Sequence, residues 1–306
     1  MNALAAGDPT ENDLHAGLSA DEAREVAAAL PLAHRFTLGT EITPVQLAFL
    51  DLHGFLVFAQ VATQEEVDAI LAAVDEVQTQ FLAEGRQKAH GVPIWVGRDE
   101  HDAPYIQRFA YLSMFSDTVR RFVTDDRFEP VRKLIGADAR IGHDELDGVV
   151  FNRYVKAAGS LRPQLGWHTD GLRDVFYGEL PGPMLNVGLH FRRIRVEDGG
   201  LRLIPGTHKQ GYWGFVFRKL YFLDHRPDAE EIPVETFPGD LTVHDGRLWH
   251  RVAASRYEGA RSRRESMYVP YVTGIRKPQT EDSETKGYMK VLNAGMRLKA
   301  WLVRKR

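Results

Sequence analysis

The stretch GWHTDG, residues 166–171, carries the strongest structural signal in this chain. Residues i and i+2 of a strand or a tight turn point to the same side. His168 and Asp170 can therefore present an imidazole nitrogen and a carboxylate oxygen to one metal ion. A His-x-Asp tripeptide alone is a weak signal, because such pairs are more often ordinary surface residues. The segments around it decide between a metal site and chance.

Short apolar or alternating runs, separated by glycine and proline, surround this stretch from about residue 141 onward. Such spacing is typical of an antiparallel β-sandwich or barrel. The segment 198–208 ends in a Pro-Gly turn, as the corner of a jelly roll requires. We expect strands at residues 149–154, 185–191, 201–204, 214–217, 241–244 and 267–272.

Helical signals dominate the chain before residue 141. They include good N-caps at Thr43 and Thr63, where Thr63 and Glu66 form a capping box. Apolar residues then recur at helical spacing. We expect a helix between Thr43 and Gly54, a strand at 55–58, a helix from Thr63 to Phe81, a helix after Ser116 and a short helix ending at Gly136.

The chain is expected to have three parts. Residues 1–42 have few large apolar side chains and predict a loose N-terminal arm, with at most one short helix near residues 20–30. Residues 43–285 form one domain, in which a helical N-terminal layer packs on the β-structure. Residues 286–306 contain seven Lys or Arg and no acid, which indicates a basic C-terminal helix or tail.

Composition excludes several classes of protein. The 306 residues are 43% hydrophobic and 26% charged, which is typical of a globular chain with a buried core. Without cysteine there is no disulfide, no cysteine-ligated metal cluster and no thiol nucleophile. A net charge of −3 argues against nucleic acid as a partner. No apolar run approaches the roughly 18 residues of a membrane span, and residues 1–17 do not resemble a secretory signal. A cytoplasmic location is therefore expected.

A second histidine lies much further along the chain, at the end of GDLTVHDGRLWH, residues 239–250. Two histidines and one carboxylate from separate strands form the facial triad typical of non-haem Fe(II) oxygenases, which leaves three coordination positions open. His250 is therefore the candidate partner of His168 and Asp170.

The segment RESMYVPY, residues 264–271, predicts a strand that carries an arginine. Arg264, Ser266 and Tyr268 share one face of this strand. An arginine fork binds a carboxylate through two hydrogen bonds, and a neighbouring hydroxyl can donate a third. This face is a candidate site for a small carboxylic acid.

Taken in order, these segments resemble the phytanoyl-CoA dioxygenase family of Fe(II)/2-oxoglutarate-dependent oxygenases. The matching segments are WHTDG at 167–171, GGLRLIPGTHKQG at 199–211, GDLTVHDGRLWH at 239–250 and RESMYVPY at 264–271. TPVQLAFLDLHGFLVF at 43–58 is also similar to the usual start of that family, and the resemblance covers roughly residues 43 to 275. It implies a mostly β fold with an α-helical N-terminal layer, namely a double-stranded β-helix, which is a cupin-like jelly roll.

The resemblance also implies an iron site. His168, Asp170 and His250 would be the iron ligands and so the catalytic residues. Related halogenases replace the carboxylate with a small residue so that chloride can bind. The presence of Asp170 therefore favours hydroxylation over halogenation.

A 2-oxoglutarate site is implied as well. Arg264 would bind the far carboxylate of 2-oxoglutarate, with support from Ser266, and Asn152 would be a further cosubstrate contact. The segment between His250 and Arg264 is longer than is common in the family, so Arg261 and Arg263 stay open as alternatives. Many relatives have Trp where this chain has Gly188, and the glycine would leave more room near the cosubstrate.

The implied function is that of a dioxygenase that uses Fe(II), 2-oxoglutarate and O2 to oxidise, most simply to hydroxylate, an unactivated C–H bond. The substrate would be a small molecule, for example of specialised metabolism, and no nucleic acid partner is expected. Two alternatives are a cupin-like divalent-metal enzyme that does not use 2-oxoglutarate and a non-catalytic jelly-roll binding protein. The sequence does not identify the substrate or the oligomeric state.

Other polar residues are weaker candidates. His244 could replace His250, but its neighbour Asp245 would point to the opposite face of the strand. Gln107 and Arg108 could line the substrate entrance. Structural roles are expected for the remaining conspicuous residues, His143, Glu145, His190 and His208.

Overall fold

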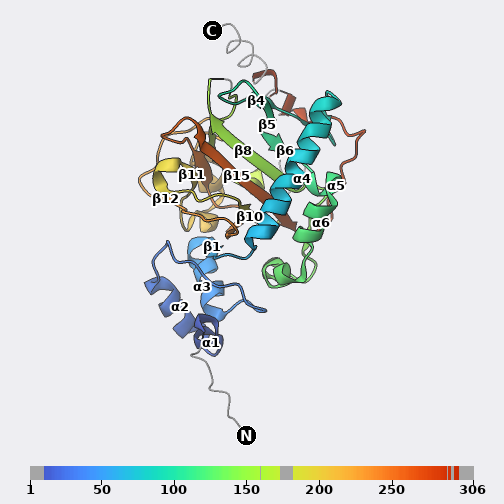
Figure 1. The fold of residues 1–306 in the computed structure, drawn as a ribbon. Coiled ribbons are helices and arrows are strands. Elements are labelled where there is room, and N and C mark those ends of the chain that lie inside the picture. The colour runs from blue at the N-terminus through green and yellow to red at the C-terminus, as the bar shows by residue number, and fades with distance from the viewer. Residues whose placement is uncertain (1–9, 159, 173–181, 288, 291–292, 296–306) are drawn as a thin grey trace.

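The computed structural model describes residues 10–158, 160–172, 182–287, 289–290 and 293–295. Two antiparallel β-sheets form the double-stranded β-helix, and helices cover the outer face of the larger sheet (Figure 1). The larger sheet has the order β1-β13-β10-β15-β8-β6, with β7 paired to β15. Its strands are β1 (Phe55–Phe58), β6 (Arg108–Phe109), β7 (Arg140–Ile141), β8 (Val150–Lys156), β10 (Met184–His190), β13 (Leu241–Asp245) and β15 (Gly259–Val272).

The smaller sheet has the order β12-β11-β14-β9. It consists of β9 (Leu165–His168), β11 (Gly200–Leu203), β12 (Ile232–Pro233) and β14 (His250–Ala253). Two separate hairpins pair β2 (Lys88–Ala89) with β3 (Val92–Pro93) and β4 (Val96–Arg98) with β5 (Pro104–Ile106). The strands expected at 149–154, 185–191, 201–204 and 241–244 are therefore present within two residues of their predicted ends, and the one expected at 267–272 is the second half of the longer strand β15.

The helices lie mainly in the first half of the chain, as predicted. The α-helices are α1 (Glu11–Ala16), α2 (Ala20–Ala29), α3 (Pro44–His53), α4 (Gln64–Ala83), α5 (Leu112–Phe115), α6 (Asp117–Val123), α7 (Glu129–Arg132) and α9 (Tyr212–Phe217). The 3-10 helices are η1 (Asp126–Phe128), η2 (Lys133–Ile135), η3 (Val196–Asp198) and η4 (Thr207–Lys209). None of the helices in the described part of the chain has the length and apolar character needed to cross a bilayer.

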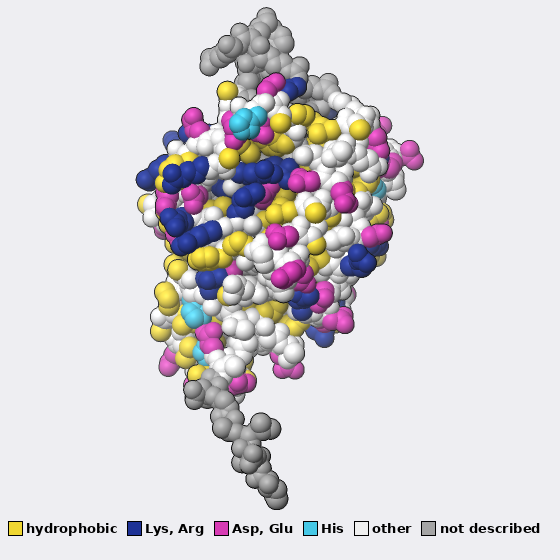
Figure 2. All heavy atoms as spheres, in the orientation of Figure 1, with side chains coloured by type: hydrophobic (Ala, Val, Ile, Leu, Met, Phe, Trp, Pro, Cys, Tyr) yellow, Lys and Arg dark blue, Asp and Glu magenta, His cyan; other side chains and the backbone are white. Residues whose placement is uncertain are grey.

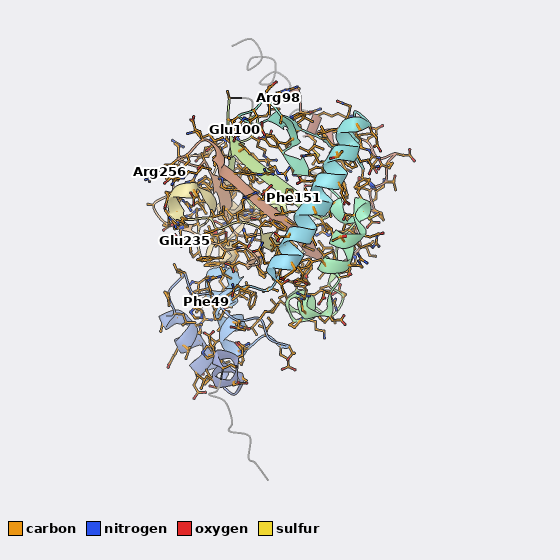
Figure 3. All side chains as sticks on the ribbon, viewed as in Figure 1. Phe49, Arg98, Glu100, Phe151, Glu235 and Arg256 are labelled. Atoms are coloured by element: carbon orange, nitrogen blue, oxygen red, sulfur yellow. The ribbon has the colours of Figure 1, made fainter. Side chains whose placement is uncertain are left out.

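Helix α4 holds the helical layer against the larger sheet. It begins with the predicted capping box of Thr63 and Glu66. Its apolar residues at helical spacing are buried: Val67, Ile70, Ala73, Val74, Val77 and Phe81. Arg153 on β8 reaches back to the helix, with Nη2 2.9 Å from Oδ1 of Asp75. One hydrophobic core joins this layer to the sheet, from Phe49 on α3 to Phe151 on β8 (Figure 3).

A buried carboxylate ties the outer face of the larger sheet together. The Glu265 side chain on β15 is fully buried and forms ion pairs with Arg153, Arg192 and Arg263. These arginines hold the pKa of Glu265 below its ordinary value although burial opposes this effect. Figure 2 shows Lys and Arg side chains gathered where β8 and β15 cross this face. Residue 265 therefore points outward, which sends its neighbours 264 and 266 into the barrel.

Two segments differ from their sequence-based expectations. Residues 10–42 are not a loose arm: α1 and α2 are both capped, Ala23 and Ala27 are fully buried, and Phe36 forms a β-bridge with Phe58. The expectation failed because small alanines suffice to pack a helix closely on α3. The basic segment 286–306 lies mostly outside the described residues.

The expected strand at 214–217 is wrong, because this segment belongs to helix α9. Trp213 and Phe217 stack with their ring centroids 5.4 Å apart, which is the i, i+4 contact of a helix. Both rings are largely exposed, so the segment has no sheet face to bury. An apolar run alone could not distinguish the two structures.

His190 is structural, as the sequence analysis favoured. It lies buried at the end of β10, with Nε2 3.0 Å from Oγ1 of Thr242 on β13. Burial, helped by the nearby His244, lowers the pKa of His190 to about 3. The folded protein therefore holds this ring neutral well below pH 6.5.

Replacing His190 with Gln should flatten the pH dependence of stability. Below pH 6.5 the unfolded chain takes up a proton at His190 and the folded chain does not, so acidification destabilises the wild type. Between pH 7.5 and pH 5.5 the free energy of unfolding of the wild type should fall by about 1.4 kcal/mol more than that of H190Q. Urea titrations at the two pH values measure this difference. The other histidines contribute equally in both proteins, so their effect cancels in the comparison. Equal losses in both proteins would contradict it.

Candidate metal centre

The two candidate histidines meet because their strands pair. His168 ends β9, His250 begins β14, and the antiparallel register places the two residues directly opposite each other. Cross-strand partners point their side chains to the same face. Here the two imidazole centroids lie 4.0 Å apart, and both residues are buried.

Each of these imidazoles is held with one nitrogen free. Nδ1 of His168 donates to the carbonyl of Gly166 at 2.9 Å, and Nδ1 of His250 donates to the carbonyl of Leu248 at 2.9 Å. A carbonyl can only accept, so the proton of the neutral ring lies on Nδ1 and Nε2 keeps its lone pair. Burial lowers the pKa of His168 to about 4 and that of His250 well below its ordinary value. Both rings are therefore neutral and available as ligands at pH 7.

Asp170 completes the cluster. It follows the end of β9 at the start of a helical segment that is described for residues 170–172. One ligand atom each from His168, Asp170 and His250 lie within 4.8 Å of one another. Among the described residues, only this group of His, Asp and Glu has the arrangement of a metal site. The structure thus brings together the three predicted ligands.

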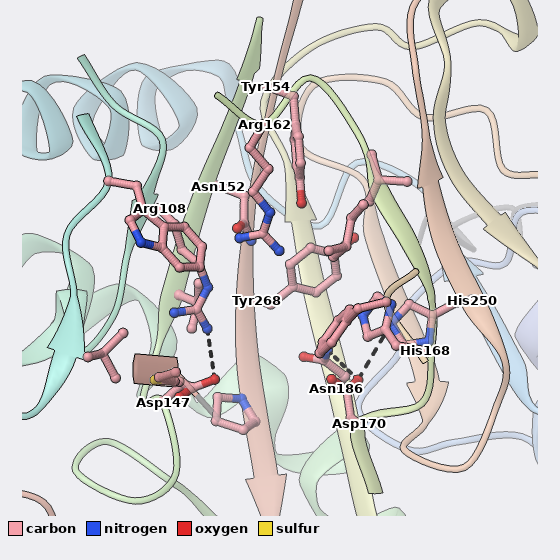
Figure 4. Close-up of a pocket in the computed structure, with 18 of the residues that line it drawn as sticks. Arg108, Asp147, Asn152, Tyr154, Arg162, His168, Asp170, Asn186, His250 and Tyr268 are labelled. Atoms are coloured by element: carbon pink, nitrogen blue, oxygen red, sulfur yellow. Dashed lines mark hydrogen bonds and ion pairs between the residues drawn. The ribbon is translucent and has the colours of Figure 1, made fainter. Parts of the chain in front are cut away.

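Asn186 on β10 holds the carboxylate in place, and sequence analysis did not identify it. Its amide Nδ2 donates to Oδ2 of Asp170 at 2.8 Å (Figure 4). Asn186 is a polar residue between apolar ones in the run 185–189, which was a weak sign of an inward-facing role. Such contacts to a metal-ligating carboxylate orient it for the ion.

His244 lies beside this cluster without replacing His250. Its Nε2 is 3.4 Å from Oδ2 of Asp170, and its ring centroid is 4.5 Å from that of His250. Its neighbour Asp245 points elsewhere and binds Arg247. The alternative ligand pair His244 and Asp245 is therefore not supported by the geometry.

The candidate metal ligands line a cavity of about 110 Å³ between the two sheets. Figure 4 shows the cluster at one end of this cavity and the ion pair of Arg108 and Asp147 at the other. Tyr221 and Phe222 form part of its aromatic wall. Arg108 is thus at the pocket, whereas Gln107 points away and hydrogen-bonds Tyr105 and Ser160.

Arg264 lies deeper in the barrel, next to this cavity. It lines a smaller cavity of about 30 Å³ together with Ser266. Tyr154, Val252 and Tyr268 line both cavities, so the two cavities adjoin at these residues.

The guanidinium of Arg264 is held by backbone carbonyls. Nη2 donates to Pro163 at 2.6 Å, Nε donates to Ser262 at 3.3 Å, and Nη1 donates to Ala253. Burial lowers the pKa of Arg264 to about 10. No carboxylate of the described residues pairs with it. Within the described part of the chain, Arg264 is thus a buried cation without an ion-pair partner.

The alternatives to Arg264 point away from the barrel interior. Arg263 binds Glu265 on the outer face, with Nη2 3.0 Å from Oε1. Arg261 is exposed, and its guanidinium lies 3.5 Å from the ring centroid of Tyr257. Of the three arginines, only Arg264 lines a cavity beside the metal cluster.

Asn152 and Ser266 lie together on the inner face. They are directly opposite in the register of β8 and β15, and Asn152 lines the larger cavity. The space expected at Gly188 is not open, because a Cβ there would lie 2.5 Å from Cε1 of Tyr268. The Tyr268 ring thus fills the volume that a larger side chain at 188 would need.

Other residues singled out in the sequence have structural roles. Nδ1 of His143 lies 2.8 Å from Oγ of Ser113, and Nε2 of His208 lies 3.0 Å from the carbonyl oxygen of Asp51. Glu145 forms an ion pair with Arg140.

Comparison with known proteins identifies the family. The sequence matches phytanoyl-CoA dioxygenase (PhyH) over residues 50–264. The dioxygenase AndF of Emericella variicolor is 32% identical over 78 residues, which are 25% of this chain and only 24% of AndF.

Solved structures share the fold. HygX of Streptomyces hygroscopicus, crystallised with iron bound, is 21% identical, with a TM-score of 0.55 over 80% of this chain and 92% of HygX. EctD of S. alaskensis, crystallised with 2-oxoglutarate and 5-hydroxyectoine, is 17% identical, with a TM-score of 0.58 over 85% of this chain and 88% of EctD.

The chain belongs to the phytanoyl-CoA dioxygenase family, since the family match covers more than two thirds of it. It is therefore a 2-oxoglutarate-dependent non-haem iron oxygenase.

Replacing Asn186 with Ala should weaken metal binding about tenfold, since it frees the Asp170 carboxylate to rotate. Anaerobic titration of the metal-free protein with Fe(II), followed by calorimetry, measures the dissociation constant. The control N12A removes an amide from the remote helix α1 and should leave that constant unchanged. Equal affinities for N186A and the wild type, with both proteins folded, would show that Asn186 does not position the ligand.

Proposed function

We propose that this protein hydroxylates an unactivated C–H bond of a small organic substrate, with His168, Asp170 and His250 as the ligands of Fe(II). The observation that carries the proposal is the pairing of a metal-ligand cluster with an uncompensated arginine just behind it. Either feature alone would fit other proteins. Together they match what a chelating dicarboxylic cosubstrate needs.

The donor set fits ferrous iron. Two neutral imidazole nitrogens and one carboxylate oxygen from three chain positions form a facial triad, in which one side of the ion stays open. The hydrogen bonds from both Nδ1 atoms fix the tautomers that coordinate through Nε2. Because both pKa values are lowered, metal binding at pH 7 displaces no proton from either ring.

Arg264, Ser266 and Asn152 fit the cosubstrate. A buried guanidinium without an acidic partner is costly unless a ligand supplies the negative charge. The far carboxylate of 2-oxoglutarate would do so at Arg264, with the Ser266 hydroxyl on the same strand face. Asn152 would contribute its amide from the neighbouring strand β8.

Bound iron, 2-oxoglutarate and O2 supply the oxidising power, with succinate and CO2 as the products of the cosubstrate. The protein orients the partners and excludes water. Tyr154 and Tyr268 separate the seat of Arg264 from the outer cavity, and Tyr221 and Phe222 cover the ligands from the other side. The carboxylate at position 170 favours hydroxylation over halogenation.

The size of the cavity indicates the size of the substrate. A cavity of about 110 Å³ suits a small molecule or one end of a larger one. Specialised metabolism as the setting and a cytoplasmic location, where 2-oxoglutarate is available, stay predictions.

Replacing Arg264 with Gln should raise the dissociation constant of 2-oxoglutarate between about 10-fold and 100-fold, the effect of losing a charge-assisted pair. Anaerobic addition of Fe(II) and 2-oxoglutarate to the wild type should give a weak visible charge-transfer band. Titrating that band with 2-oxoglutarate measures the constant. Succinate release across a panel of small molecules then identifies substrates.

The matched controls are R263Q and R261Q, which remove the same charge from the outer face and should bind 2-oxoglutarate like the wild type. A wild-type protein that binds Fe(II) but gives no band would favour a metal enzyme that does not use 2-oxoglutarate. Unchanged affinity in R264Q would assign the cosubstrate anchor to another residue.

A further inference from the structure

A second arginine lies in the larger cavity and has no role in the site described so far. Arg162 belongs to the segment before β9 and projects into the cavity between Asn152 and the metal cluster (Figure 4). Its guanidinium carbon lies 5.2 Å from the ring centroid of Trp95, which supports it from one side. This cation–π contact positions the charge without neutralising it.

The charge of Arg162 has no acidic partner among the described residues. The one carboxylate whose charge acts on the pKa of Arg162 is Asp147, and it forms an ion pair with Arg108 at 2.8 Å. The guanidinium of Arg162 also makes no hydrogen bond within the described part of the chain, although its five N–H groups are all donors. Loss of contact with water lowers its pKa, and the nearby Arg108 adds to this effect.

Arg162 is also close to the candidate metal centre. Arg162 lines the same cavity as His168, Asp170 and His250. The next residue, Pro163, accepts the hydrogen bond from Nη2 of Arg264 at 2.6 Å, which fixes the backbone beside Arg162. The cavity therefore holds the Arg162 cation, the three candidate metal ligands and the aromatic side chains of Tyr221 and Phe222.

The cosubstrate does not account for both cations. 2-Oxoglutarate has one carboxylate remote from its chelating end. Arg264 and Ser266 would bind this carboxylate in the deeper cavity. Arg162 lines the larger cavity, where the substrate has to bind for its C–H bond to reach the metal. One uncompensated cation is thus left on the substrate side.

We propose that Arg162 binds a carboxylate of the substrate, so that this oxygenase acts on an organic acid. The inference rests on the proposed function and names the substrate class of the same site. Tyr221 and Phe222 contact the apolar part, and the carbon to be oxidised lies at the end nearest the metal.

The test compares acids with their neutral amides. The probes are phenylacetate, 3-phenylpropionate and cyclohexanecarboxylate, each paired with its primary amide. Calorimetry measures their binding to the anaerobic protein loaded with Fe(II) and 2-oxoglutarate. The wild type should bind at least one acid about 10 times more tightly than its amide, since only the acid forms a charge-assisted pair. R162Q should lose this preference, and R162K should keep part of it.

The control variant is R256Q, which removes one positive charge from an exposed arginine (Figure 3) and should retain the preference. The dissociation constant of 2-oxoglutarate should stay within about twofold of the wild type in R162Q. A tenfold loss of 2-oxoglutarate affinity in R162Q would make Arg162 a cosubstrate residue and overturn the inference. An acid preference that is absent from all three pairs, or that persists in R162Q, would overturn it as well.

Failure of the proposed function gives a different result. In that case the wild type would form no charge-transfer band with Fe(II) and 2-oxoglutarate. The calorimetric comparison is then made on the protein loaded with Fe(II) alone, and it still decides whether Arg162 selects acids.

Discussion

The pairing of β9 with β14 is the constraint on which the rest of the structure depends. It sets His168 directly opposite His250, although the two residues lie far apart in the chain. A slip of one residue in this register would turn one of the rings to the other face of the sheet. The buried cluster of Trp167, Ile204 and Trp249 lies beside this pairing and stabilises it, because residues 167 and 249 adjoin the two histidines. Packing on one face of the smaller sheet thus fixes the chemistry on the other.

Charge is distributed unequally over the two faces of the larger sheet. On the outer face, Glu265 forms ion pairs with three arginines, and one of them, Arg153, also pairs with Asp75. On the inner side, Arg264 and Arg162 have no acidic partner among the described residues, although the chain as a whole is slightly acidic. Arg264 is buried and Arg162 is half-buried. Cations that are shielded from water without a partner lower the stability of a fold unless a ligand binds to them. Because they lie beside a metal-ligand cluster, these two arginines indicate a pocket that binds anionic ligands.

The sequence predicted those features that depend only on residues close together in the chain. The caps at Thr43 and Thr63, the strand at 55–58 and the inward face of 264, 266 and 268 follow from spacing alone. The ligand set needed the family resemblance, because no local rule pairs residues 168 and 250. Asn186 and Arg162 were missed since their roles arise only when β10 and the segment before β9 meet at the cavity. The strand expected at 214–217 failed for the opposite reason, as a locally plausible pattern found no partner strand.

Gly188 shows how one inner position depends on another. Its neighbour across the sheet is Tyr268, and a Cβ at 188 would come within 2.5 Å of that ring and 2.7 Å of Oγ1 of Thr242. The Tyr268 ring therefore fits only because residue 188 has no side chain. A large aromatic residue at position 188 would require something smaller than tyrosine at position 268, because protein interiors have no spare volume for both. The aromatic wall of the cavity beside Arg264 thus comes from Tyr268 on β15 and Tyr154 on β8 and not from β10. Strand β15 then supplies the Tyr268 ring, the hydroxyl of Ser266 and the guanidinium of Arg264, so its register sets all three at once.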